Sequence, residues 1–95
     1  MIKHVVLWDV AADKQANIII IKDALESLVD TVSEIRFLEV GLNVGTSPRA
    51  KDIMLTVHFD SLEDLEAYRI HPEHQKVVKI LSGIAVDGVA IDYEI

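Results

Sequence analysis

The sequence has 95 residues, of which 51% are hydrophobic and 26% charged, with a formal net charge of −7 and no cysteine. This negative charge opposes binding to nucleic acid and to anionic membranes, and the apolar run from Ile18 to Ile21 is far too short to cross a bilayer. Without cysteine there is no disulfide framework, and we recognise no signal peptide, so we expect one domain over residues 1–95 in the cytoplasm.

The first half of the chain predicts a strand, a helix and a second strand. Residues 2–10 are dense in β-branched side chains, which favours a strand. Apolar side chains then recur three and four residues apart, so an amphipathic helix should begin at Asp13 as its N-cap and end between Thr31 and Glu34. The second strand is predicted over residues 35–44, followed by a loop that contains Gly, Ser and Pro.

The second half predicts a strand, a broken helix and a last strand. A third strand over residues 52–59 leads to Ser61, which we expect to cap a helix with Asp64 three residues later. Pro72 lacks an N–H and disfavours the α conformation before it, so this helix should pause there and start again. Gly83 offers a stop, and residues 85–95 form the last strand.

The order β-α-β-β-α-β predicts an α+β, ferredoxin-like subunit: an antiparallel sheet with its first and third strands central and both helices on one face. Neither face is polar, since Val5 and Leu7 point one way while Val6 and Trp8 point the other. The third strand repeats this pattern. Leaving large apolar side chains exposed to solvent, rather than buried, would cost roughly 1.5 to 3 kcal/mol each. We therefore expect a homodimer whose sheets pack face to face.

Several stretches together resemble the stress-responsive dimeric α/β-barrel (Dabb) domain family. They are Met1-Ile2-Lys3-His4-Val5-Val6-Leu7, Leu38-Glu39-Val40-Gly41, Phe59-Asp60-Ser61-Leu62-Glu63-Asp64-Leu65-Glu66-Ala67-Tyr68, His71-Pro72-Glu73-His74 and Asp92-Tyr93-Glu94. The resemblance covers essentially the whole chain. It implies a dimer of ferredoxin-like subunits that form a dimeric α/β barrel between their two sheets.

One plant branch of that family resembles the chain and cyclises linear polyketides without a cofactor. It uses a tyrosine and a histidine at the positions of Tyr68 and His74, and has another cavity histidine at His4; Ile53 stands where it has a further histidine. Related dimeric barrels include cofactor-free monooxygenases and haem-degrading enzymes. The plant relatives also suggest a cation held by backbone carbonyls at positions matching Val29, Val32 and Ile35.

The histidines allow two interpretations each. His74 could take a proton from an acidic carbon while the Tyr68 phenol bonds the enolate, or His71 and His74 could cap the broken helix above a core Tyr68. His4 shares a strand face with Val6 and Trp8, and we assign this face to the barrel interior. His4 is there either a core residue or a ligand contact. Zinc at His71 and His74 lacks a third ligand.

Two functions follow. The first is a homodimer that binds a small apolar molecule in the barrel, against Trp8, Val6, Ile53 and His71. The alternative is a cofactor-independent enzyme, a polyketide-type cyclase or lyase or a monooxygenase, that uses Tyr68 and His74 with His4. We expect no cofactor and no side-chain metal site. If His4, Tyr68 and His74 all line one solvent-reachable pocket, the enzyme hypothesis gains support; if His74 is turned outward as a cap, the binding or structural hypothesis does.

Overall fold

The computed structural model describes residues 1–95. Its elements follow the predicted order, with each predicted helix divided in two. They are β1 (Ile2–Val10), α1 (Lys14–Glu26), α2 (Leu28–Thr31), β2 (Phe37–Leu42), β3 (Ile53–Phe59), α3 (Leu62–Ile70), α4 (Pro72–Leu81) and β4 (Ala85–Glu94). None of these helices combines the length and the hydropathy needed to span a lipid bilayer.

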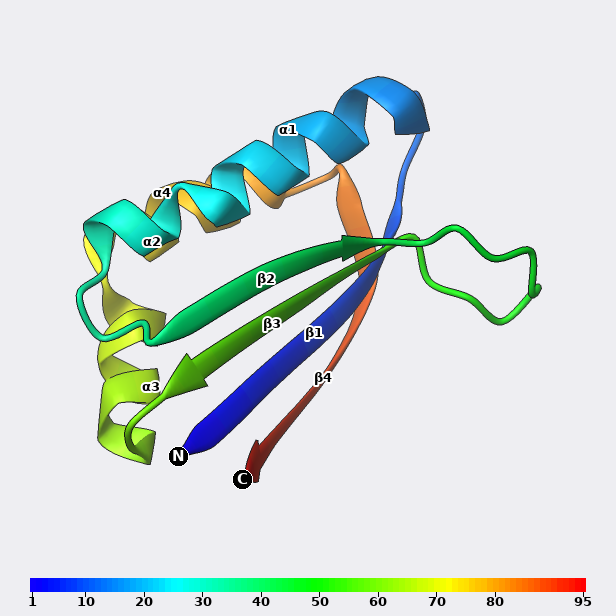
Figure 1. The fold of residues 1–95 in the computed structure, drawn as a ribbon. Helices are drawn as coiled ribbons and strands as arrows, with labels where there is room; N and C mark the ends of the chain where they lie inside the picture. The colour runs from blue at the N-terminus through cyan, green and yellow to red at the C-terminus, as the bar shows by residue number, and fades with distance from the viewer.

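The four strands form one antiparallel sheet in the order β2-β3-β1-β4, and all the helices lie on one side of it (Figure 1). The first and third strands are therefore central and the second and fourth are at the edges, as the sequence predicted. β1 pairs with β3 over its length, from Ile2 opposite Phe59 to Trp8 opposite Ile53. This ferredoxin-like arrangement is the predicted fold class.

The start of α1 differs from the prediction. Asp13 occupies the N-cap position, but its side chain makes no capping hydrogen bond. Its φ is 33° and that of Ala12 is 31°, so two successive residues adopt left-handed backbone conformations. Asn17 instead donates its side-chain amide to the carbonyls of Ala11 and Ala12, each at 3.1 Å. The turn before α1 is thus closed by a side chain inside the helix.

The predicted break in the second helix is present. The Ser61 hydroxyl accepts a hydrogen bond from the Asp64 amide at 3.2 Å, which caps α3. Pro72 occupies the first turn of α4, and His71 ahead of it accepts the Glu73 amide on Nδ1 at 3.1 Å. His71 is therefore the cap of α4, which confirms one of the two interpretations given to it.

The core lies between the sheet and the helices. The buried side chains of β3, Ile53, Leu55, Val57 and Phe59, all belong to one face and pack with buried residues of the helices: Ile21, Leu25, Leu28, Leu65, Tyr68, Val77 and Leu81. His4, Val6 and Trp8 share that face, because His4 and Val6 stand opposite Val57 and Leu55. The expectation that these three line a barrel between two sheets is wrong: helices of the same chain cover them. Strand alternation separates the two faces of a sheet but does not say which one the helices cover.

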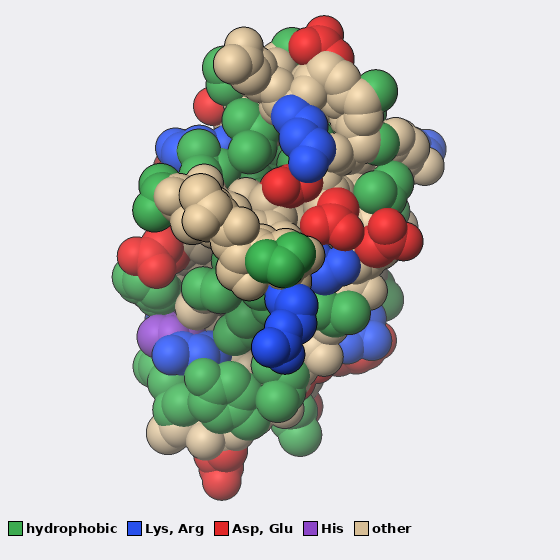
Figure 2. Space-filling model, turned by 90° about the vertical axis from the view of Figure 1, so that its right-hand side faces the viewer, with side chains coloured by type: hydrophobic (Ala, Val, Ile, Leu, Met, Phe, Trp, Pro, Cys, Tyr) green, Lys and Arg blue, Asp and Glu red, His purple; other side chains and the backbone are tan.

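The helix-free face carries mostly apolar side chains. Successive cross-strand rows place Phe37, His58, Lys3 and Tyr93 together, then Glu39, Thr56, Val5 and Ile91, then Gly41, Met54, Leu7 and Val89. Ile91 is 57% exposed and Val89 53%. His58 stacks against Phe37 with ring centroids 4.7 Å apart, and its buried Nε2 has no hydrogen-bond partner. Hydrophobic side chains also reach the surface between charged ones in Figure 2.

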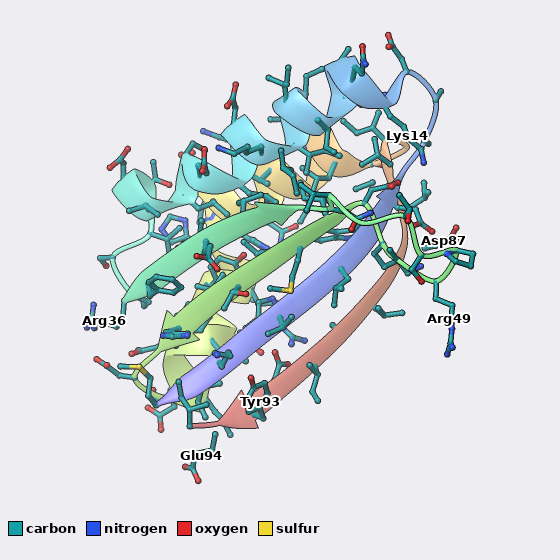
Figure 3. The ribbon with its side chains drawn as sticks, turned by 45° about the vertical axis from the view of Figure 1, so that its right-hand side comes forward. Lys14, Arg36, Arg49, Asp87, Tyr93 and Glu94 are labelled. Carbon is teal, nitrogen blue, oxygen red and sulfur yellow. The ribbon has the colours of Figure 1, made fainter.

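The two ends of the chain lie side by side at one corner of the sheet (Figure 1). The Ile95 amide donates to the Met1 carbonyl at 2.9 Å. The loop between β2 and β3 projects from the opposite end, where the Asp52 carboxylate accepts the Val10 amide at 2.7 Å. Figure 3 labels residues at both ends of β4. Tyr93 and Glu94 lie near the chain termini, and Asp87 lies near the β2–β3 loop.

Candidate active or ligand-binding site

A cavity of about 230 Å³ lies between the sheet and the helices, and we call it the inner pocket. Three polar rings from three elements contribute to it: His4 from β1, Tyr68 from α3 and His74 from α4. The remaining lining is apolar: Val6, Trp8, Leu25, Leu55, Val77, Val78 and Leu81. The three residues thus line one cavity, as the enzyme hypothesis requires.

The ring geometry shows how the helix break builds this site. The ring centroids of Tyr68 and His74 are 4.3 Å apart, and those of His4 and Tyr68 are 5.9 Å apart. Tyr68 lies in α3 and His74 in α4, and the non-helical His71 between them redirects the chain. The change of direction lets side chains six positions apart meet in one cavity.

His74 is held as a neutral ring with a defined tautomer. Its Nδ1 lies 3.1 Å from the Arg69 carbonyl oxygen, which can only accept, so Nδ1 carries the proton and Nε2 remains an acceptor. Burial lowers the pKa of His74 below 6.5; the Arg69 carbonyl opposes this, and nearby His4, Arg69 and His71 add to it. A neutral imidazole with a free acceptor nitrogen is suited to accept a hydrogen bond or a proton.

Tyr68 is held as a neutral phenol. Only 2% of the residue is exposed, and burial raises its pKa far above the usual value. Its ring packs on Phe59 with centroids 5.0 Å apart. The hydroxyl makes no hydrogen bond within the chain. It is also not fully buried, because the only fully buried side-chain nitrogen or oxygen without a partner is His58 Nε2. Tyr68 thus combines a packed ring with a hydroxyl that has no partner within the chain.

His4 is paired with a carboxylate that the sequence reasoning missed. Asp92 of β4 stands directly opposite His4, and its Oδ1 lies 2.5 Å from Nδ1 of the imidazole. Arg69 approaches the other oxygen of Asp92 at 3.8 Å. Since a carboxylate accepts, Nδ1 is the donor and the ring orientation is fixed. The register of β1 against β4 was the signal that could have found this pair.

Other candidates lie outside the inner pocket. His71 caps α4, and Ile53 is a core residue 2% exposed near the β2–β3 loop. The Val32 carbonyl, one of the three suggested for a cation, accepts the Ile35 amide at 3.3 Å. No cluster of three or more His, Asp or Glu side chains is placed to hold a metal ion. The largest hollow, about 370 Å³, opens beside the β2–β3 loop and has no histidine or tyrosine in its lining.

Comparison with known proteins identifies the family. The family model described as the Stress responsive A/B Barrel Domain matches residues 2–95. The chain belongs to this family. A stress-response A/B barrel domain-containing protein of Arabidopsis thaliana is 31% identical over 98% of the chain, and another is 29% identical over 98%. The chain spans only 46% and 36% of their lengths. An uncharacterised Streptomyces coelicolor protein is 29% identical over 99% of both chains.

Solved structures agree with membership in the A/B barrel domain family. A dimeric protein of unknown function with a ferredoxin-like fold from Bacteroides fragilis matches with a TM-score of 0.87 and 35% identity, over 99% of this chain and 95% of the other. A hydroxynitrile lyase from Passiflora edulis matches with a TM-score of 0.87 over 99% and 92% of the two chains, at 17% identity. The second likeness shows the shared fold alone.

Proposed function

We propose that residues 1–95 act as a single A/B barrel domain that binds a small, mostly apolar molecule in the inner pocket. The observation that carries this proposal is the lining of this cavity, which is apolar except for His4, Tyr68 and His74. Ligand sites of this kind combine apolar walls with a few convergent polar groups. The site is thus proposed within one subunit, between its sheet and its helices.

The protonation states define the chemical class of the ligand. The Tyr68 hydroxyl is a neutral donor and His74 has a free acceptor nitrogen at neutral pH. A ligand with a hydroxyl group at one end and hydrocarbon elsewhere would match both, because a hydroxyl accepts from Tyr68 and donates to Nε2 of His74. The net charge of −7 gives no support for nucleic acid as a partner.

Titration calorimetry with hydrophobic alcohols tests the binding proposal. Replacing His74 by Ala should weaken binding about two- to tenfold, as expected for one lost hydrogen bond of roughly 0.5 to 1.5 kcal/mol. His71→Asn is the matched control, because Asn keeps an N-cap acceptor on α4 and removes a histidine outside the pocket. Equal losses in both variants would refute the proposed site.

A second candidate is cofactor-independent proton transfer, and the contact between the Tyr68 and His74 rings favours it. A neutral His74 would act as the general base toward a carbon acid, while the Tyr68 hydroxyl would donate to the developing enolate oxygen. His74→Ala should then abolish turnover of a carbon-acid substrate and leave the fold intact. Unchanged turnover would rule out this chemistry.

We also propose that the domain is a homodimer joined through its helix-free face. The apolar side chains exposed there and the dimeric Bacteroides fragilis relative support this. Ile91→Lys on that face should give a monomer of 10.6 kDa by light scattering. Ile19→Lys on the outer side of α1, equally exposed, should leave the dimer intact. A dimeric Ile91→Lys protein would contradict this interface.

The cytoplasm is the proposed location, supported by the cysteine-free composition, which suits a reducing compartment. Cell fractionation with an antibody against the native chain tests it. Recovery of the chain outside the cytoplasmic fraction would refute this location.

A further inference from the structure

Trp8 lies beside an irregularity in the sheet. β1 and β4 pair in register from Ile2 to Leu7, but the next pair joins Asp9 to Val86, so β4 carries one extra residue and places Asp87 and Gly88 opposite Trp8. Asp87 in this bulge has a left-handed backbone with φ 53°. A bulge of this type bends the edge strand and redirects the side chains around it. Its position is the end of β4 nearest the β2–β3 loop (Figure 3).

Gly88 in the same bulge provides the space that the indole fills. A Cβ atom at Gly88 would lie 2.8 Å from both Cδ1 and Nε1 of Trp8, which is closer than ordinary van der Waals contact. The indole therefore lies directly over the backbone of β4. Any side chain at position 88 would displace it, so the glycine and the bulge together set the position of the indole.

Two hollows share the indole in their linings. Trp8 lines the inner pocket and also a second hollow of about 300 Å³, which we call the outer pocket. Val78 and Leu81 of α4 also line both, and we call these three shared side chains the wall. The outer pocket adds only Ser82 and Ala85, and no titratable side chain.

The titratable side chains are thus confined to one of the two pockets. His4, Tyr68 and His74 line only the inner pocket, and the wall and the outer pocket are hydrophobic apart from Ser82. A molecule whose polar end met these three rings and whose chain ran toward Trp8 would meet the indole. Only a displaced or smaller side chain at position 8 would let that chain continue.

We propose that Trp8, held by Gly88, is a specificity-determining partition that limits the length of the ligand's hydrocarbon chain. The ligand class is an amphiphile with a hydroxyl head and an unbranched tail that ends at the indole. This inference rests on the proposed binding function of the inner pocket. Removing the indole joins the two pockets and lets longer tails bind.

A homologous series of straight-chain primary alcohols tests the partition by titration calorimetry. In the wild type, affinity should rise about fourfold for each methylene that enters the inner pocket, then stop rising when the tail reaches Trp8. In Trp8→Ala the rise should continue at about fourfold per methylene into the outer pocket. Ile19→Ala, on α1 and outside both pockets, should keep the wild-type limit.

Gly88→Ala keeps the indole but moves it, so this variant provides a second test if Trp8→Ala fails to fold. The Gly88→Ala substitution should shift the limiting chain length. Trp8 is the only tryptophan, so its fluorescence reports both the displacement in Gly88→Ala and the arrival of a tail in the wild type. An unchanged limit in a folded Trp8→Ala protein, or in Gly88→Ala with displaced fluorescence, would overturn the partition.

The same titrations distinguish this inference from the binding function on which it rests. Alcohol binding that depends on His74 but has the same length limit with and without the indole refutes the partition alone. A limit that moves with Trp8 while His74→Ala binds normally supports the partition and refutes the proposed polar contact. No saturable binding by any alcohol to wild type, Trp8→Ala and Gly88→Ala refutes both.

Discussion

Removing only the hydroxyl of Tyr68 separates its structural role from a role in binding. The ring is buried against Phe59, His4 and His74, whereas the hydroxyl makes no hydrogen bond within the chain. Tyr68→Phe preserves the packed ring and removes a group that has no protein partner. The free energy of unfolding should therefore change by less than about 0.5 kcal/mol, as for a substitution that breaks no native interaction.

The effect on binding should be larger than the effect on stability. A ligand that accepts from the hydroxyl would lose one hydrogen bond, about 0.5 to 1.5 kcal/mol, or about two- to tenfold in affinity. Tyr68→Ala, in contrast, empties a core position that is 2% exposed and should lower stability by about 3 to 5 kcal/mol, the range for large aromatic truncations. Tyr68→Phe should therefore lose mainly affinity, whereas Tyr68→Ala should lose mainly stability.

Urea denaturation at neutral pH measures the stability of the wild type and both variants, and calorimetry with one alcohol ligand measures the affinity of the wild type and Tyr68→Phe. The slope of free energy against urea should stay constant in Tyr68→Phe, which would show that the native and unfolded surfaces are unchanged. A stability loss above about 1 kcal/mol in Tyr68→Phe would show that the hydroxyl bonds within the fold, and the assignment of a ligand-facing donor would be refuted.

Three further results are expected. Asp52→Ala should lower stability by about 1.5 to 3 kcal/mol because the buried Val10 amide loses a charged acceptor, whereas Asp52→Asn retains an oxygen acceptor and should lose less; equal losses in urea melts would contradict this. Because burial lowers the pKa of His74, its contribution to stability is present above pH 6.5 and is lost as pH falls through the folded-state value; His74→Gln should lack that loss in the same melts. Ser61→Ala should lower the thermal midpoint, since an N-cap contributes about 1 kcal/mol, and an unchanged midpoint would mean that the cap is not needed.

Local signals in the sequence predicted the fold because each acts over a few residues. The cap at Ser61 and the break at Pro72 depend on neighbours in the chain, and both are where expected. The same break brings Tyr68 and His74 together, so two of the three polar rings could be predicted as a pair. The strand order then followed from the succession of elements.

Features that depend on distant residues were not predictable in the same way. Asp92 is 88 positions from His4, and only the pairing of β1 with β4 brings them together. Both faces of β1 are apolar, so the alternation of side chains did not show which face the helices would cover. Asp13 failed as a side-chain cap because its backbone is left-handed, a conformation that no neighbouring residue type signalled.

The adjacency of Met1 and Ile95 has a consequence for engineering. A short peptide could join these two positions, and new ends could be opened in the exposed β2–β3 loop without crossing any strand. Such a circularly permuted chain should keep the same sheet order and pocket. The new ends would also lie far from the old ones. A reporter attached to the new ends would leave the edge strand β4 free.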